Sequence, residues 1–116
     1  MSERNSLFYL QDMLESIAAI ESFLLGINRE SFAQDRKTYS ATIRELEIIG
    51  EASGNVPEAI QNLNPDIPWR TLKDFRNVLA YHYFGVNVDI VWDIVQKKLP
   101  KLREQIEEVL AKVSLL

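Results

Sequence analysis

Residues 10–24, LQDMLESIAAIESFL, carry large apolar side chains at steps of three and four residues. This spacing places those side chains on one face of an α-helix, because a helix turns once every 3.6 residues. Ser6 is the expected N-cap, and Gly26 is the expected stop. The stretch therefore predicts a first amphipathic helix whose apolar stripe consists of Leu10, Met13, Leu14, Ile17, Ile20 and Leu24.

A second helix is expected over about residues 39–53, where the inward-facing side chains are Ile43, Leu46 and Ile49. The polar stretch before it, residues 28–37, has room for a short helical turn around Phe32. Gly50 lies inside the second helix, at a cost of about 1 kcal/mol relative to alanine. It indicates either close helix–helix packing, which we favour, or space for a ligand or a partner's backbone.

Prolines and glycines divide the rest of the chain. The second helix is expected to end at residues 53–55. A short helix should then run from Pro57 to about Leu63. Residues 64–68 should form a turn, because two prolines stop helix continuation. A third main helix is expected from Trp69 to Tyr83, with Gly85 as its cap. Asn87 or Asp89 then caps a last helical run through Val113, which Pro100 either kinks or splits.

No alternating pattern longer than four residues predicts a strand. The expected fold is all-α, an antiparallel bundle of four or five helices in one domain over residues 1–116.

Composition excludes several classes of protein. The 116 residues include no cysteine and one histidine, which excludes a disulfide framework, thiolate metal sites and the usual multi-imidazole zinc sites, so we expect no metal or cofactor. Acidic residues in the first 25 positions and the lack of a long uncharged apolar run predict neither signal peptide nor membrane span, and hence a cytoplasmic protein. The net charge of −4 disfavours non-specific nucleic-acid binding, so any nucleic-acid activity needs a local basic patch.

Residues 74–85, DFRNVLAYHYFG, hold the residue types that could carry chemistry. His82, the single histidine, can take or give a proton near neutral pH, and Arg76 can hold a phosphate through two parallel hydrogen bonds. Together they are the minimal parts of a metal-independent ribonuclease, in which a ribose 2′-hydroxyl attacks the adjacent phosphate. A histidine near a helix C-terminus also suits the helix dipole without any catalytic role. The carboxylate pair Glu47 and Glu51 is most simply a solvated face.

This segment resembles the HEPN superfamily, and specifically its HepT-like toxin branch. The family signature is an arginine followed after four to six residues by a histidine, and here five residues separate Arg76 from His82. The flanks are similar as well, in the order expected along nearly the whole chain: EIIGEA (47–52), Pro68-Trp69, RNVLA (76–80), YFGV (83–86), Val91-Trp92 and LPKL (99–102).

The resemblance implies a helical bundle that forms a homodimer, with the two motifs meeting in a cleft between protomers. It implies an RNA-cleaving toxin, acting on tRNA or another RNA, and a minimal nucleotidyltransferase antitoxin that transfers AMP to a tyrosine. By position, Arg76 would bind the scissile phosphate, His82 would be the general acid or base, and Tyr83 would accept AMP. Supporting roles fall to Asn77, Tyr81, Glu51 and Asp74, and RNA binding to Arg70 and Lys73.

The chain departs from the HepT pattern at one point. The common form is Arg-x4-His-x-Tyr, whereas this chain has Arg-x5-His-Tyr. At about 100° per residue, an ideal helix places Tyr83 within about 20° of Arg76 but turns the imidazole of His82 by roughly 100° from its usual direction.

A dimer would supply both a base and an acid for cleavage. It would also bring Arg70, Lys73 and Arg76 of two protomers together, which gives six positive charges. The alternatives are a non-catalytic HEPN dimer that binds and regulates a nucleotidyltransferase or a nucleotide, and a purely structural helical protein.

Overall fold

The computed structural model describes residues 3–81 and 87–114, and these residues are almost entirely helical. The elements in chain order are α1 (Glu3–Phe23), α2 (Arg29–Gln34), α3 (Arg36–Asn55), α4 (Glu58–Leu63), α5 (Trp69–Tyr81), α6 (Val88–Asp93), the π-helical turn η1 (Ile94–Lys98) and α7 (Leu99–Ser114). Within the described ranges there is no strand. The all-α prediction is therefore confirmed.

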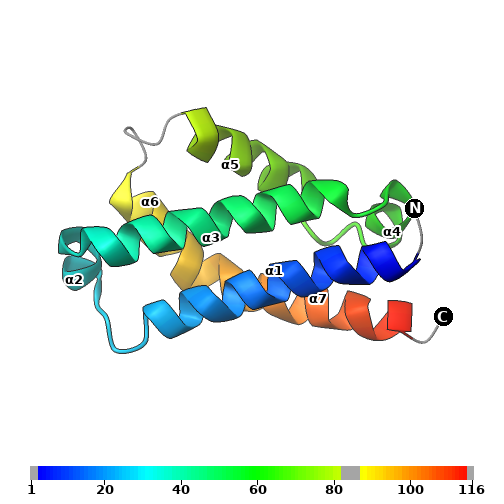
Figure 1. Cartoon of the computed structure of the whole chain (residues 1–116), viewed down its shortest axis with the longest axis horizontal. Helices are drawn as coiled ribbons and strands as arrows, with labels where there is room; N and C mark the ends of the chain where they lie inside the picture. The colour runs from blue at the N-terminus through cyan, green and yellow to red at the C-terminus, as the bar shows by residue number, and fades with distance from the viewer. Residues whose placement is uncertain (1–2, 82–86, 115–116) are drawn as a thin grey trace.

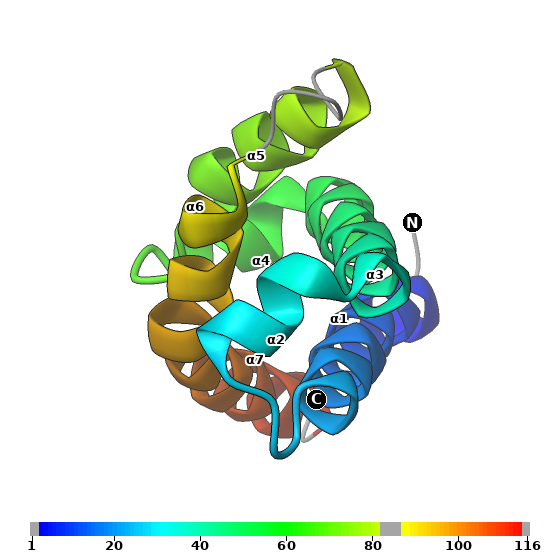
Figure 2. The same ribbon diagram turned by 90° about the vertical axis from the view of Figure 1, so that its left-hand side faces the viewer.

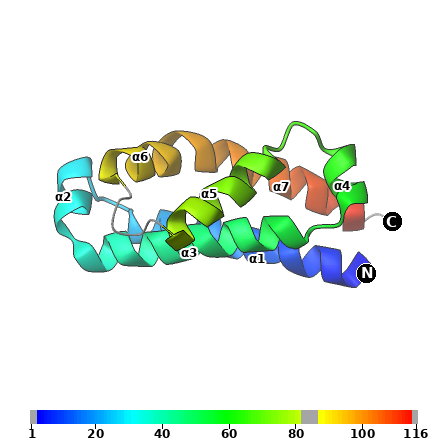
Figure 3. The ribbon, with the colours of Figure 1, turned by 90° about the horizontal axis from the view of Figure 1, so that it is seen from above.

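Four long helical runs build the bundle. α1 and α3 lie antiparallel and side by side, α7 packs along α1, and α5 lies against α3 at an inclination to it (Figure 1). The view from above shows α5 crossing over α3 (Figure 3). Seen end-on, the short helix α2 covers one end of the bundle (Figure 2). This arrangement confirms the predicted antiparallel bundle, with α2 and α4 as short additions.

The core follows the stripe that the sequence predicts on the first helix. Leu10, Met13, Ile17 and Ile20 are each at most 1% exposed. Burying such a side chain completely contributes roughly 1.5–3 kcal/mol. The helix stops where predicted, because Gly26 has φ +76°, a left-handed conformation that suits glycine. Together these features position α1 as the helix on which α3 and α7 both pack.

The predicted N-cap of the first helix is wrong. Ser6 lies inside α1, which already begins at Glu3, and its side chain is only 2% exposed. Ser6 precedes Leu10 by four residues, so it extends the buried stripe by one turn. A serine on the apolar side of a helix is thus part of the packed face here.

Phe32 fixes the end of the bundle that α2 covers. Its side chain is fully buried, and its ring lies 5.5 Å from that of Tyr39 and 5.3 Å from that of Trp92, measured between centroids. Burial raises the pKa of Tyr39. These three aromatic rings come from α2, α3 and α6, so they join both halves of the chain at this end. The predicted short helical turn around Phe32 is confirmed as α2.

The second long helix starts three residues before its predicted start at Tyr39. Asp35 is the N-cap of α3, and its carboxylate accepts from the Thr38 hydroxyl at 2.6 Å and from the Thr38 backbone N–H at 3.2 Å. A side-chain oxygen at this position satisfies N–H groups that have no partner in the first helical turn. The cap explains why the helix includes Arg36–Thr38.

Replacing Asp35 with alanine should lower the urea midpoint of unfolding at neutral pH but not in strong acid. The hydrogen bonds from Thr38 lower the pKa of Asp35 below its ordinary 3.8 in the folded chain. The carboxylate therefore stabilises the fold above that ordinary pKa, and its contribution is lost as the pH falls through the folded value. The contribution of the carboxylate to stability is measured by comparing the urea midpoints of unfolding of the wild type and Asp35→Ala at about pH 7 and at about pH 2. An equal gap at both pH values would contradict the expected role.

Pro100 neither splits the last run nor leaves it regular. α6, η1 and α7 follow one another without a break, and the turn before the proline is π-helical, with the N–H of Leu99 donating to the carbonyl of Ile94. Proline has no N–H, and its ring collides with the carbonyl four residues earlier in a regular helix. The wider turn accommodates the proline, as π-turns inside helices often do.

The third main helix begins at Trp69 as predicted and is described as far as Tyr81. Its predicted last residues and the Gly85 cap lie outside the described residues. Asn87 caps α6, and its side chain accepts from the N–H of Asp89, which decides between the two predicted caps. Among the described helices, none has the length and apolar character that crossing a membrane requires.

Candidate functional site

Arg76 is positioned by the contact between α5 and α3. Trp69, Leu72 and Arg76 are half-buried residues along one side of α5. A Cβ added to Gly50 of α3 would lie 2.5 Å from the Cβ of Arg76 and 3.0 Å from the carbonyl oxygen of Leu72. The absent side chain therefore allows the two helices to approach closely. This confirms the packing interpretation of Gly50 and shows that its partner is the candidate catalytic arginine.

The polar end of Arg76 is not neutralised by the described part of the chain. It forms neither a salt bridge nor a hydrogen bond with any side chain that the structure describes. A guanidinium has five N–H donors in a planar fork that matches a phosphate. Its stem is fixed by Gly50 and its donors are not used by those residues, which suits a side chain that binds an anion.

The neighbouring candidates are only partly described. Asn77 lies within α5, and Tyr81 is the last residue of that helix. His82 and Tyr83, the predicted general acid or base and the predicted acceptor of AMP, lie outside the described residues. The geometry of the site therefore starts from Arg76.

The remaining predicted side chains on α5 face solvent. The side chain of Arg70 is 94% exposed, and its Nε lies 3.9 Å from a carboxylate oxygen of Asp74, which is a loose i,i+4 pair. Lys73 is also exposed. Asp74 thus pairs with Arg70, and among the described side chains no hydrogen bond or ion pair joins it to Arg76. Arg70 and Lys73 are accessible to a polyanion, whereas no supporting contact from Asp74 is seen.

The two candidate carboxylates on α3 differ in their surroundings. Glu47 forms a salt bridge with Arg44 at 3.6 Å, in keeping with a solvated face. Glu51 is exposed and follows Gly50 directly. No ion pair within residues 3–81 and 87–114 connects Glu51 to Arg76. The structure thus brings Gly50 of α3 against the stem of Arg76 on α5, and Glu47 and Glu51 form no ion pair with Arg76.

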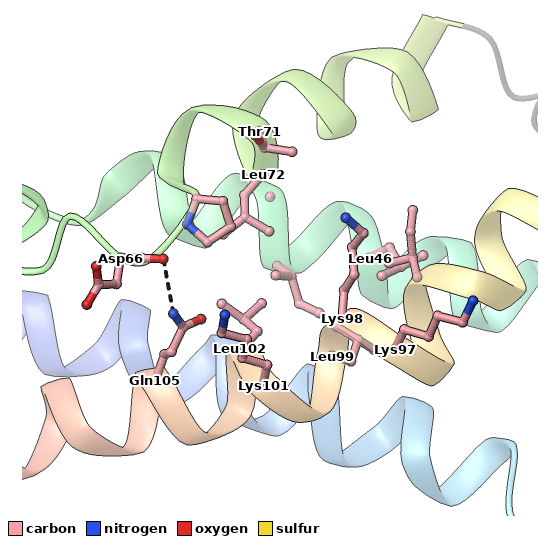
Figure 4. A pocket seen from close by; sticks show the side chains of 14 residues that line it. Leu46, Asp66, Thr71, Leu72, Lys97, Lys98, Leu99, Lys101, Leu102 and Gln105 are labelled. Atoms are coloured by element: carbon pink, nitrogen blue, oxygen red, sulfur yellow. Dashed lines mark hydrogen bonds between the residues drawn. The ribbon is translucent and has the colours of Figure 1, made fainter.

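A groove that sequence reasoning missed adjoins the same contact. It has a volume of about 490 Å³ and lies between α3, α5 and the run η1–α7 (Figure 4). Gly50, whose added Cβ would collide with the stem of Arg76, and Leu72 form part of its wall, and Lys97, Lys98 and Lys101 come from the opposite side. One sequence feature could have drawn attention to it: residues 94–103 contain three lysines and one arginine without any acidic residue, in a chain of net charge −4.

Comparison with known proteins assigns the chain to a family. The family model described as "Ribonuclease HepT-like" matches residues 13–109, a range that includes Gly50, Arg76 and His82. A protein of Thermococcus cleftensis named as a probable ribonuclease HepT is 45% identical over 101 residues, which cover 87% of this chain and 92% of that protein. A protein of Methanocaldococcus jannaschii with a provisional RNase name is 39% identical over 114 residues, covering 98% of this chain and 94% of the relative.

A third relative, from Caldanaerobacter subterraneus, also has a provisional RNase name and is 36% identical over 104 residues, or 90% of this chain and 93% of its own length. No solved structure gives a significant match. The family model covers most of the chain, and the relatives align over nearly their full lengths. With its all-α bundle and its arginine–histidine segment inside the matched range, this chain belongs to the HepT-like ribonuclease family of the HEPN superfamily.

Proposed function

We propose that this chain is a metal-independent ribonuclease that acts as the toxin of a toxin–antitoxin pair. The observation that carries the proposal is the family match over residues 13–109, which includes the segment from Arg76 to Tyr83. The names of the relatives support RNA cleavage as the reaction. The position of Arg76 supports it further, because its stem is held against Gly50 and its guanidinium has no partner among the described residues.

In the proposed reaction, a base removes the proton of a ribose 2′-hydroxyl, whose oxygen attacks the adjacent phosphorus. The bond from phosphorus to the 5′-oxygen of the next nucleotide breaks, and an acid returns a proton to that oxygen. Arg76 holds the phosphate and stabilises the charge that develops on its oxygens. His82 is the base or the acid. Because one histidine serves one step at a time, a homodimer with facing motifs provides both groups.

The proposed dimer would also allow a chain with a negative net charge to bind RNA. Arg70 and Lys73 are exposed on the helix that carries Arg76, so two facing copies of α5 would present six positive charges to RNA. Such a local patch offsets the net charge of −4 per chain. Asn77, Tyr81, Glu51 and Asp74 remain candidates for supporting roles in this dimeric cleft. A chain that sediments as a monomer at micromolar concentration would contradict this part of the proposal.

The proposed partner is a minimal nucleotidyltransferase that transfers AMP to Tyr83. The tyrosine follows His82 directly, so a bulky, negatively charged nucleotide there would block RNA and repel its phosphates. Regulation of this kind needs no change in the bundle. We expect the toxin and its partner to act in the cytoplasm, where both ATP and RNA are present.

Growth after induced expression tests the proposal. The wild type alone should arrest growth, and purified protein should cleave RNA equally well in EDTA. His82→Ala should restore growth, because it removes the proton-transfer group. Co-expression of the nucleotidyltransferase should rescue the wild type but not Tyr83→Phe, which lacks the acceptor hydroxyl.

The specific observation that favours a second function is the five-residue spacing between Arg76 and His82, where the common HepT form has four. In that function the dimer binds and regulates the nucleotidyltransferase, or a nucleotide, without cleaving RNA. Wild type and His82→Ala would then both permit growth, and both would still bind the partner. This outcome would overturn the ribonuclease proposal.

A further inference from the structure

The groove beside Arg76 combines a closed apolar floor with unpaired cations. The floor residues Leu46, Ile49, Leu99 and Leu102 are each at most 5% exposed. At one end of the groove, the side-chain amide of Gln105 donates a hydrogen bond to the carbonyl of Asp66 at 3.0 Å (Figure 4). This bond joins α7 to the loop before α5. The volume of about 490 Å³ lies within the roughly 300–1,000 Å³ typical of ligand sites.

Three lysines give the groove its charge. Lys97 pairs with Asp93 at 2.8 Å, and that carboxylate raises the pKa of Lys97. Lys98 and Lys101 form no ion pair with any acidic side chain that the structure describes. Lys98 extends from the π-helical turn into the space facing α3 and α5 (Figure 4). The π-turn before Pro100 thus presents Lys98 at the edge of the groove, and the first turn of α7 presents Lys101 there, both without an ion pair among the described side chains.

The groove shares two of its lining residues with the contact that positions the candidate catalytic arginine. Gly50 and Leu72 line it, and the Cβ position of Gly50 and the carbonyl oxygen of Leu72 are the points where α3 and α5 meet at Arg76. An elongated anion lying in the groove would have Lys98 and Lys101 on one side, and on the other Gly50, which contacts the stem of Arg76. A chain with repeated phosphates can contact cations at several positions along such a groove, whereas a single small anion cannot.

We propose that this groove is a subsite for single-stranded RNA, in which Lys98 and Lys101 bind phosphates next to the one that Arg76 holds. The proposal rests on the proposed ribonuclease function and names where the substrate continues beyond the reacting phosphate. A nucleotide base would cover Leu72 and Ile94, the half-buried apolar residues of the lining.

A single strand fits these features better than the two other partners that an anion-binding groove suggests. An acidic amphipathic helix would need a broad exposed apolar track, and the four floor residues expose 5% or less each. A double helix keeps its bases stacked inside, whereas an unpaired base can turn toward an apolar wall. Lysine binds phosphate as a point charge on a flexible stem, which suits a strand of variable sequence.

The test compares the double variant Lys98→Gln/Lys101→Gln with a matched control, Lys37→Gln/Lys112→Gln. The control removes the same charge from exposed positions on α3 and α7 that do not line the groove. Binding is measured by fluorescence anisotropy with a short 2′-O-methylated RNA of mixed sequence, which has no free 2′-hydroxyl to attack the phosphate. Cleavage is measured separately with unmodified RNA.

The groove variant should bind the RNA about 10-fold more weakly at low salt than the control variant does. The slope of log affinity against log salt should fall by about 1.4, since each lost phosphate contact accounts for about 0.7 with single strands. KM should rise by a similar factor while kcat stays close to that of the wild type, because the lysines do not touch the reacting phosphate.

Different outcomes overturn the subsite and the proposed function. Equal RNA affinity of the two double variants, with a wild type that cleaves RNA, overturns the subsite and leaves the function intact. A wild type that neither binds nor cleaves RNA overturns the function. Unchanged RNA affinity together with loss of nucleotidyltransferase co-purification would show that a protein, and not RNA, occupies the groove.

Discussion

Arg76→Ala is expected to lower the rate of RNA cleavage by about 100- to 1,000-fold, the usual loss when a donor to a developing oxyanion is removed. The fold should change little, because alanine keeps the Cβ that packs against Gly50 and removes only the outer side chain. Since the guanidinium acts on the transition state, kcat should fall more than KM rises. Single-turnover cleavage of labelled RNA and a thermal melt of the same sample measure both effects.

Two further variants make this result specific to the guanidinium. Arg76→Lys keeps the positive charge but loses the planar pair of donors, so its activity should lie between those of the wild type and Arg76→Ala. Arg44→Ala removes the same charge from an exposed position on α3, where the side chain is 68% exposed and pairs with Glu47, and should cleave as the wild type does. An Arg76→Ala variant as active as Arg44→Ala would remove Arg76 from the mechanism.

Helical periodicity was sufficient to predict the bundle. The stripe on α1 and the inward positions Leu46 and Ile49 on α3 are buried as their spacing indicates, because burial of apolar area dominates the free energy of folding. Gly26 could also be predicted, since few residues other than glycine adopt its positive φ. These features depend on residues that are close in sequence, where a single turn of helix determines the geometry.

Helix ends and the proline were less predictable because several local solutions compete. Ser6 has the chemistry of an N-cap, yet its place on the apolar stripe put it inside α1. Asp35 is the N-cap of α3, and its carboxylate accepts two hydrogen bonds from Thr38. At Pro100 the sequence allowed a kink or a break, and packing of α6 and α7 in one continuous run selected a π-helical turn.

The candidate site required tertiary structure for the same reason. Gly50 and Arg76 are 26 positions apart, and their contact depends on how α5 crosses α3, which periodicity does not determine. The lysines of the groove were visible in the sequence as a run without acidic residues, but a solvated helix face has the same composition. Only the position of α5 opposite that run forms a groove from it. The contact at Gly50 therefore links the packing of α3 and α5 to the position of Arg76, the proposed phosphate-binding residue.

Gly50→Ala is expected to destabilise the protein and to reduce cleavage, although alanine favours helices over glycine by about 1 kcal/mol. The new Cβ would lie 2.5 Å from the Cβ of Arg76 and 3.0 Å from a backbone oxygen, so α5 must move away from α3. Overpacking of this kind typically costs about 1–3 kcal/mol, and Gly50→Val should cost more. Because Arg76 moves with α5, cleavage should fall even at temperatures where the variant remains folded.

Gly54→Ala provides the matched control, because Gly54 lies one turn further along α3 and nothing comes within 4 Å of an added Cβ. There the helix preference of alanine acts alone and should stabilise the chain by up to about 1 kcal/mol, with cleavage unchanged. Urea unfolding of both variants and the wild type gives the two free-energy differences with opposite signs. If Gly50→Ala were as stable and as active as Gly54→Ala, the close approach of α3 and α5 would not be what positions Arg76.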